Sequence, residues 1–322
     1  MTDFSANPNE LASIDSLTPC LSQSPAHQAQ STVDQIRRLV WKIAIATFVL
    51  MAIGSATRVM NAGLACPDWP LCYGTLLPRQ QMNLQVFLEW FHRLDAALIG
   101  ILTIVLVSLS GWHRRSIPGW TPWVATLSLG LILFQGILGG LTVTELLRFD
   151  IVTAHLGTAL LFFSTLLVMG TQLLPYQGTG TVGKLPWVSL TTVLFIYLQS
   201  LSGALVGSQW ALHQCLMLAQ LCSVMNTHLI GVIPASLAVL TTVFLAFRTP
   251  NLHSSLRQLA KGAGLLLLLQ IMLGVATFRL HLQVEFLTVS HQAVGAALLG
   301  VLLCFTVLAL RDRQFVKDAR MN

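Results

Sequence analysis

Eight long apolar stretches alternate with short polar segments along the chain. A helix that crosses a lipid bilayer needs about 20 consecutive apolar residues, and each stretch is close to that length. The strands of a membrane barrel would be shorter and would alternate apolar with polar positions. The pattern therefore predicts an all-α integral membrane protein with spans at about 39–58, 91–112, 121–143, 151–174, 186–207, 226–247, 259–280 and 288–310.

A short pattern of glutamine, glycine and small residues recurs in every second span. It occupies 135–142, 199–206 and 270–277, and a weaker version lies at 53–57. The glycines are expected mainly to let helix backbones approach closely in lipid. The glutamine and threonine side chains need polar partners, which another helix or a ligand could provide.

This repeat divides the chain into two four-helix bundles with the same topology. Two halves of four spans each are related by an axis along the membrane normal. The expected organisation is a disordered tail at 1–36, an N-terminal half at 37–174, a glycine-rich linker at 175–185, a C-terminal half at 186–311 and a second tail at 312–322.

Composition and charge support the membrane assignment and orient the chain. The sequence is 54% hydrophobic and 9% charged, whereas soluble domains carry about 25% charged residues. With the N-terminus in the cytoplasm, 13 of the 18 Lys and Arg lie inside, which is the asymmetry of the positive-inside rule. We therefore expect cytoplasmic termini. The net charge of +6 implies no nucleic-acid partner. No secretory signal is evident, so the first span is expected to direct insertion.

Four histidines lie at matched positions near the start of the even-numbered spans: His92, His155, His228 and His291. Because those spans run in one direction, the four imidazoles are expected at one depth in the membrane. A single histidine in an apolar helix is usually a packing residue, but an ionisable group repeated in this way indicates function. Paired imidazoles between helices hold haem iron from both faces, so the pattern predicts two haem sites.

The spacing of helices suggests which histidines pair. Adjacent helix axes are about 8–10 Å apart, which is tight for a porphyrin, whereas diagonally opposed helices leave more room. The expected pairs are therefore His92 with His155 and His228 with His291. A zinc site would need further nearby ligands, and neither half offers a local cluster beyond Glu89.

Glu89 distinguishes the two halves. It precedes His92 by three residues and so shares its helix face, whereas Met225 holds the corresponding place before His228. A helix-end charge or an ion pair with Arg93 would explain a purely structural Glu89. Its absence from the C-terminal half favours a chemical role and indicates that the N-terminal half is catalytic.

Cysteines occur in pairs in two equivalent loops on the predicted outer side. Cys66 and Cys72 lie between the first two spans, and Cys215 and Cys222 lie between the fifth and sixth. Disulfides form outside the cytoplasm, and the loop between Cys66 and Cys72 allows one. The pairs are either structural cross-links or redox groups. Cys20 and Cys304 have no evident partner.

Taken together, these motifs resemble the haem A synthase family, in its bacterial and mitochondrial forms, over about residues 39–310. The resemblance rests on the Gly-Ser-Ala-Thr-Arg end of the first span, the Pro-Asp-Trp-Pro loop between Cys66 and Cys72, and Glu-x-x-His-Arg at Glu89. It also rests on Gln-x-x-Leu-Gly-x-x-Thr before His155 and His291, and on the cysteine pair before His228.

The resemblance implies a haem chemistry for each half. His228 and His291 would be the axial ligands of a haem B cofactor. His92 and His155 would ligate or position the substrate, haem O, with Glu89 as a catalytic acid or base and Cys66–Cys72 as a redox-relevant pair. The C8 methyl group of haem O would be oxidised through successive hydroxylations to a formyl group, giving haem A for haem–copper terminal oxidases.

It also implies a setting in the bacterial plasma membrane, with membrane lipid, haem O synthase and oxidase assembly factors as partners. Three positions depart from the family pattern: Ser55 replaces a common glycine, Ser202 replaces a leucine of the repeat, and Leu229 rather than arginine follows His228. The missing arginine leaves open what anchors one haem's propionates. The alternatives are a bis-histidine cytochrome b that carries electrons, and a haem transporter or chaperone.

Overall fold

The computed structural model describes residues 25–207, 219–280 and 283–321, with side chains only for 29–207, 223–280 and 283–314. The described residues form eight long helices and no β-strand, and all eight are long and apolar enough to cross a membrane. The predicted all-α membrane protein of eight spans is thus confirmed. The helices are α1 (Pro25–Val59), α2 (Leu84–Trp112), α3 (Thr121–Thr144), α4 (Phe149–Gln172), α5 (Leu185–Val206), α7 (Ala219–Arg248), α8 (Ser254–Arg279) and α9 (Glu285–Met321).

The first helix corrects the predicted limit of the N-terminal tail, because α1 begins at Pro25 rather than after residue 36. Asp34 forms an ion pair with Arg37 one turn later, at 2.8 Å. Ile36 and Val40 are buried, so the apolar face of the span continues into this segment. Local pairing and burial can extend a helix beyond the apolar run that hydropathy detects.

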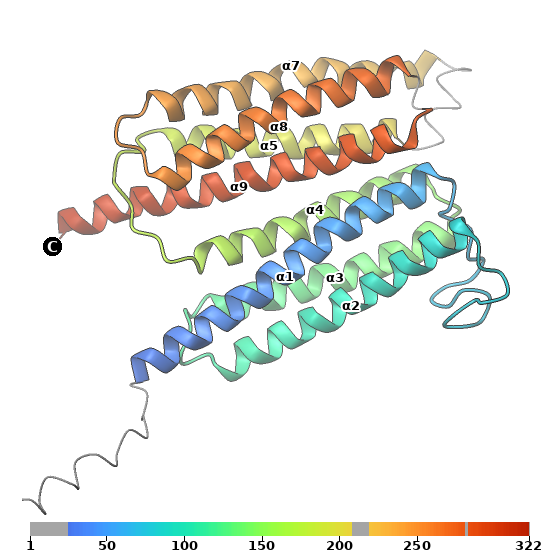
Figure 1. Ribbon diagram of the computed structural model, residues 1–322, viewed down its shortest axis with the longest axis horizontal. Coiled ribbons are helices and arrows are strands. Elements are labelled where there is room, and N and C mark those ends of the chain that lie inside the picture. Colours follow the sequence, from blue (N-terminus) through green and yellow to red (C-terminus); the bar gives the residue numbers. More distant parts are fainter. Residues whose placement is uncertain (1–24, 208–218, 281–282, 322) are drawn as a thin grey trace, which may run out of the picture.

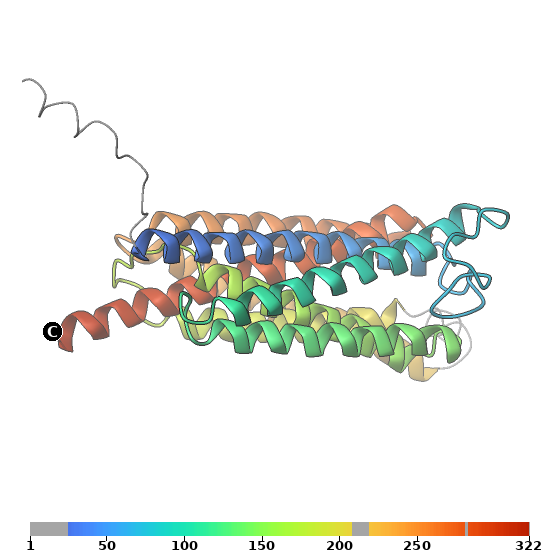
Figure 2. The same cartoon turned by 90° about the horizontal axis from the view of Figure 1, so that it is seen from below.

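The helices lie side by side in two groups of four (Figures 1 and 2). We refer to α1–α4 as the N-terminal bundle and to α5 and α7–α9 as the C-terminal bundle. In the first, α2 and α4 each pack on α1 and α3 but not on each other, and in the second α7 and α9 each pack on α5 and α8 but not on each other. The histidine-bearing helices are therefore diagonally opposed within each bundle.

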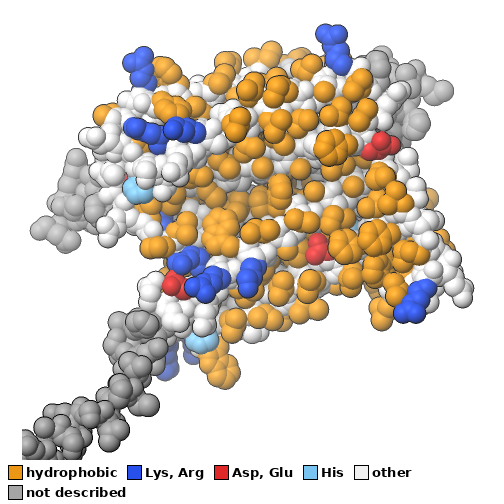
Figure 3. Space-filling view, in the orientation of Figure 1, with side chains coloured by type: hydrophobic (Ala, Val, Ile, Leu, Met, Phe, Trp, Pro, Cys, Tyr) orange, Lys and Arg blue, Asp and Glu red, His pale blue; other side chains and the backbone are white. Residues whose placement is uncertain are grey.

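The two bundles join through α9 and α4. Helix α9 packs on α1 and α4 of the N-terminal bundle, and α4 also packs on α5. Large side chains from both helices are fully buried at this junction, among them Phe162, Leu166, Leu298 and Leu302. By contrast, apolar side chains cover most of the outer face seen in Figure 3, as expected of a surface in contact with lipid.

The connection between the bundles is fixed at the end of the molecule opposite to the histidines. Asp312 of α9 is completely buried. Its carboxylate accepts hydrogen bonds from the backbone N–H groups of Thr179 and Gly180, at 2.9 and 2.7 Å, and from the Tyr176 hydroxyl. Burial and the neighbouring Asp312 raise the pKa of Tyr176. These contacts hold the linker between α4 and α5 against α9.

Candidate haem-binding cavities

Each of the four histidines packs against a glycine of the preceding helix. A Cβ atom built on Gly54, Gly203 or Gly274 would lie 2.8, 3.0 or 2.9 Å from the Cε1 atom of His92, His228 or His291, respectively. The same distance from Gly139 to His155 is 3.4 Å. The glycines of the repeat therefore make room for imidazole rings. The sequence predicted instead that they let helix backbones approach each other.

The N-terminal bundle encloses a cavity of about 460 Å³ that contains both of its histidines. His92 and His155 line it from the diagonal helices α2 and α4, and Glu89 and Arg93 lie near His92. Gln135 of the repeat also lines this cavity, and its Oε1 atom is buried without a hydrogen-bond partner.

The C-terminal bundle encloses a second cavity, of about 500 Å³. His228 and His291 line it from α7 and α9, and the repeat glutamines Gln199 and Gln270 lie beside them. Gln199 Nε2 donates to the backbone carbonyl of His228 at 2.8 Å, and Gln270 Nε2 lies 3.3 Å from His291 Nε2. Two of the three repeat glutamines thus contact the histidines that follow them.

Ser202, one of the positions that depart from the family pattern, contacts His228 directly. Its Oγ atom lies 2.9 Å from His228 Nδ1 and also donates to the carbonyl oxygen of Gln199 at 2.8 Å. The amide Nε2 of Gln199 also lies 3.1 Å from Nδ1. This ring nitrogen therefore has an amide donor beside it and, in the Ser202 hydroxyl, a group that can accept a hydrogen bond from Nδ1–H. When Nδ1 carries the proton and donates it to Ser202, His228 Nε2 is free to bind a metal ion.

Both cavities suit a haem better than a bare metal ion. Their volumes fall in the range of about 300–1,000 Å³ for small-molecule and cofactor sites. The Nδ1 atoms of His92, His155 and His291 are buried with no hydrogen-bond partner, so each of these imidazoles has unused polar capacity. No group of three or more His, Cys, Asp or Glu that could hold a metal occurs within the described residues.

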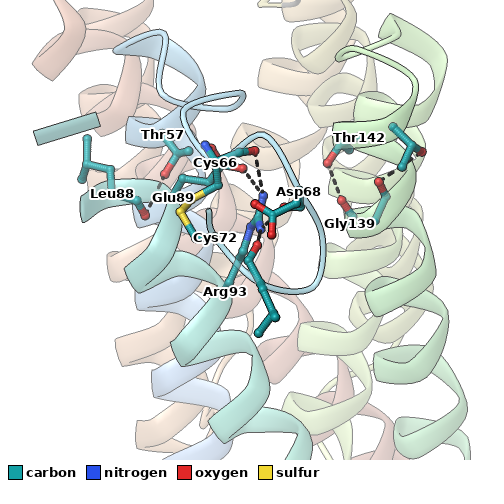
Figure 4. A network of polar contacts seen from close by, with 12 residues as sticks. Thr57, Cys66, Asp68, Cys72, Leu88, Glu89, Arg93, Gly139 and Thr142 are labelled. Carbon is teal, nitrogen blue, oxygen red and sulfur yellow. Dashed lines mark hydrogen bonds and ion pairs between the residues drawn. A yellow bond between two sulfur atoms is a disulfide. The ribbon is translucent and has the colours of Figure 1, made fainter. Parts of the chain in front are cut away.

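Glu89 belongs to a polar network that holds the loop between α1 and α2 (Figure 4). The carboxylate is 4% exposed. It accepts the backbone N–H of Cys66 at 2.8 Å and pairs with Arg93 at 2.5 Å. Glu89 therefore forms the ion pair with Arg93 that a purely structural role would require. Its carboxylate also lines the cavity beside His92.

Arg93 and the disulfide fix the same loop. Cys66 and Cys72 form the predicted disulfide, with a Cα–Cα distance of 4.8 Å. The guanidinium of Arg93 donates to the carbonyl oxygens of Asp68, at 2.6 Å, and of Leu71. Trp69, between the two cysteines, lines the cavity and packs 3.3 Å from the position of a Cβ on Gly140. The loop thus forms part of the cavity wall.

Asp68 closes this loop on itself. Its carboxylate accepts the backbone N–H groups of Tyr73, at 2.6 Å, and Gly74, at 2.8 Å. The hydrogen bond from Gly74 is the largest cause of a lowered Asp68 pKa, and Tyr73 and Arg93 act in the same direction.

Of the four remaining cysteines, the structure describes the side chain of Cys304 alone. Cys20 and Cys215 lie outside the described residues, and the side chain of Cys222 is not described. The predicted pairing role of Cys215 and Cys222 therefore stays a prediction. Cys304, for which the sequence shows no partner, accepts a hydrogen bond from the hydroxyl of Thr171 at 3.3 Å.

Arg58 and Gln292 line both cavities, although the sequence pattern predicts no ligand-binding role for either. Gln292 Oε1 accepts hydrogen bonds from Ser55, at 2.9 Å, and from Arg58, at 3.1 Å. An arginine at the end of a span is usually assigned only to topology, yet an ionisable group at this depth is itself a signal of function.

Comparison with known proteins agrees with the resemblance drawn from the motifs. A profile of the cytochrome oxidase assembly protein family matches residues 37–303. A heme A synthase of Shewanella oneidensis is 28% identical over 315 residues, covering 81% of this chain and 93% of that protein. A heme A synthase of Staphylococcus saprophyticus is 25% identical over 295 residues, covering 85% and 97%. The family match spans most of the sequence, and the chain therefore belongs to the cytochrome oxidase assembly protein family.

Proposed function

We propose that this chain is a haem A synthase. It acts on haem O in the N-terminal cavity and oxidises the C8 methyl group to a formyl group by successive hydroxylations. The product, haem A, serves haem–copper terminal oxidases. The heme A synthases similar to this chain support the enzyme class and the haem substrate, and the asymmetry of the two cavities supports the assignment of roles.

That asymmetry is the central observation. Both cavities contain a histidine pair from diagonal helices. Among the described residues, only the lining of the N-terminal cavity adds a buried carboxylate and its arginine, Glu89 and Arg93. Two binding sites of similar size with different polar groups suit a resident cofactor and a reacting substrate. An electron carrier would need no carboxylate beside one histidine pair.

In the C-terminal cavity, His228 and His291 would hold haem B, which supplies a redox centre when bound. Ser202 contacts His228 Nδ1, and a proton held there would leave Nε2 available to the iron. Gln199 fixes the backbone of the same residue.

In the N-terminal cavity, His92 and His155 would ligate or position the substrate haem, and the repeat glycines set the depth of their rings. Glu89 Oε1 and Oε2 are held by Arg93 and the Cys66 N–H. A carboxylate fixed in this way can accept a proton from a reacting group and stabilise developing positive charge. The walls around this cavity are mostly apolar, and Trp69 lines it.

We also infer that both termini lie in the cytoplasm of a bacterium, so that the histidines lie toward the outer face of the plasma membrane. The distribution of Lys and Arg supports this orientation. Haem O synthase and oxidase assembly factors are the partners that the reaction requires before and after this step.

The test is conversion of haem O in membranes that contain the full chain. Glu89→Gln preserves the size of the side chain but removes its charge. We expect it to retain haem B while haem A formation falls by about 100-fold or more, within the usual range for a general acid or base. Haem O or a hydroxylated intermediate should accumulate.

Glu145→Gln is a matched control, because Glu145 is also paired with an arginine but is exposed. It should convert haem O at the wild-type rate. Normal haem A yield from Glu89→Gln would contradict a catalytic role for Glu89. Haem B in the wild-type protein with no conversion of haem O would instead support an electron carrier.

A further inference from the structure

Arg58 belongs to the N-terminal bundle but reaches the cavity of the C-terminal bundle. It lies in the last turn of α1. Its Nη2 atom is 2.8 Å from the position that a Cβ on Gly207 would occupy, and its Cζ atom is 3.2 Å away. Gly207 follows α5 and lines only the C-terminal cavity, whereas Arg58 lines both. The charged end of this side chain is therefore presented to the cavity of His228 and His291.

The position of Arg58 in the repeat explains why its side chain has space beside Gly207. Arg58 follows Gly54 by four residues, as Gly207 follows Gly203. The two positions correspond, and each of these preceding glycines packs on a histidine. The N-terminal bundle carries the large cation at this place, and the C-terminal bundle carries no side chain. Arg58 occupies the space that Gly207 leaves.

The charge of Arg58 has no protein counterion in the part of the chain that the structure describes. No ion pair includes it there. Nη2 donates to the neutral amide oxygen of Gln292, and Nε is buried without a partner. Segment 208–218, which follows Gly207, contains no Asp or Glu. Arg279 also lines this cavity but is exposed, so its charge can be hydrated.

A desolvated guanidinium without an anion is costly inside a membrane protein. Its planar set of N–H donors matches a carboxylate. Gln292 accepts from both Ser55 and Arg58, and so fixes the guanidinium at the boundary between the two cavities. The site therefore lacks one component, which is an anionic group on the ligand.

We infer that Arg58 binds a carboxylate of the tetrapyrrole held between His228 and His291. This inference rests on the proposed haem site of the C-terminal cavity. A haem carries propionate carboxylates at one edge, and Arg58 neutralises one of them. The anchor that Leu229 cannot supply after His228 thus comes from the other bundle, and cofactor binding requires the two bundles to be packed together.

The test compares two ligands in the full-length protein, purified without haem. Iron protoporphyrin IX keeps its carboxylates, whereas its dimethyl ester does not. The wild-type protein should bind the free acid more tightly than the ester. Arg58→Gln should weaken binding of the free acid by about 10- to 100-fold, the equivalent of one charge-assisted hydrogen-bonded pair, and should leave binding of the ester nearly unchanged. Arg58→Lys should lie between the two.

Thermal unfolding provides a second test, because Arg58→Gln should change stability in opposite directions without and with haem. Without haem, Arg58→Gln should unfold at a higher temperature than the wild type, because it removes an uncompensated charge. With haem, it should gain less stability than the wild type. Arg79→Gln, an exposed outer-loop arginine, is the control and should behave as the wild type in every measurement.

The outcomes separate the two claims. If the wild-type protein binds neither ligand, the proposed haem site is wrong, and this inference fails with it. If the wild type binds haem but Arg58→Gln still discriminates between acid and ester as well as the wild type does, the haem site stands and the role of Arg58 is wrong. Equal loss of both ligands in Arg58→Gln and Arg58→Lys would show that Arg58 only supports the fold.

Discussion

At the scale of single residues, the contact between glycine and imidazole makes the sharpest steric demand. A Cβ on Gly274 would lie 2.9 Å from His291 Cε1, whereas one on Gly262 of the same helix would meet Val301 at 3.9 Å. We therefore expect Gly274→Ala to displace His291 and to destabilise the haem-bound protein by about 1–3 kcal/mol, the usual cost of overpacking. Gly262→Ala should be tolerated.

Absorption spectra and thermal unfolding of both variants check this expectation. Loss of the six-coordinate low-spin spectrum in Gly274→Ala alone would agree with it. A wild-type spectrum and stability in Gly274→Ala would show that His291 does not depend on this glycine.

Ser202 offers a test that leaves packing almost unchanged. With haem bound at Nε2, His228 Nδ1 would carry the proton. A hydrogen bond from Nδ1–H to Ser202, 2.9 Å away, would then make the imidazole a better electron donor to iron. Ser202→Ala should therefore raise the midpoint potential of the bound haem by roughly 40 mV, which corresponds to one neutral hydrogen bond of about 1 kcal/mol. Ser200→Ala is the control, because Ser200 lines the same cavity but bonds to Ile196. Equal potentials in all three proteins would contradict the proposed tuning.

The sequence alone identifies residues at repeated positions, but it does not identify residues of the two bundles that contact each other. The four histidines are recognisable because their positions match, and Glu89 and Arg93 are recognisable because one helical turn separates them. Arg58 and Gln292 are 234 residues apart. Only the packing of α1 on α9 brings them together, and no local pattern encodes that contact.

At the scale of elements, the loop between α1 and α2 has a predictable response to pH. Hydrogen bonds from Gly74 and Tyr73 lower the pKa of Asp68, so the folded loop favours the charged carboxylate. Its contribution to stability is present above the unfolded pKa of about 3.9 and is lost as pH falls through the lower folded value. The loop should therefore remain ordered from neutral pH down to about pH 4 and loosen below it.

Hydrogen exchange at the Tyr73 and Gly74 amides measures this change. Asp68→Asn should exchange faster at neutral pH and lose most of the pH dependence. Protection that is independent of pH in the wild-type protein would show that the disulfide and Arg93 hold the loop without Asp68.

Element boundaries show where hydropathy stops being informative. Apolar length locates each span because it matches the bilayer, but it does not report where the helix itself ends. Helix α1 starts at Pro25 and α9 continues to Met321, since polar residues can extend a helix beyond the lipid. The Cys66–Cys72 disulfide follows from loop length, whereas the packing of Trp69 against Gly140 depends on how α3 lies beside the loop.

At the scale of the whole molecule, the charge distribution predicts orientation. With 13 of 18 Lys and Arg on the side of the termini, a reporter fused after Asn322 should be active only when it is of a type that works in the cytoplasm. A periplasmic reporter at the same position should be silent. The reverse result would invert every loop and place the four histidines toward the cytoplasm.

The central claim is that the two cavities bind different haems for different purposes. The most direct measurement is the haem content of purified His92→Ala and His228→Ala, extracted and separated by type, beside the conversion of haem O in membranes. His92→Ala should retain haem B and lose haem A formation, whereas His228→Ala should lose most haem B. Loss of the same haem from both variants, or retention of haem B in His228→Ala, would contradict the division of roles between the bundles.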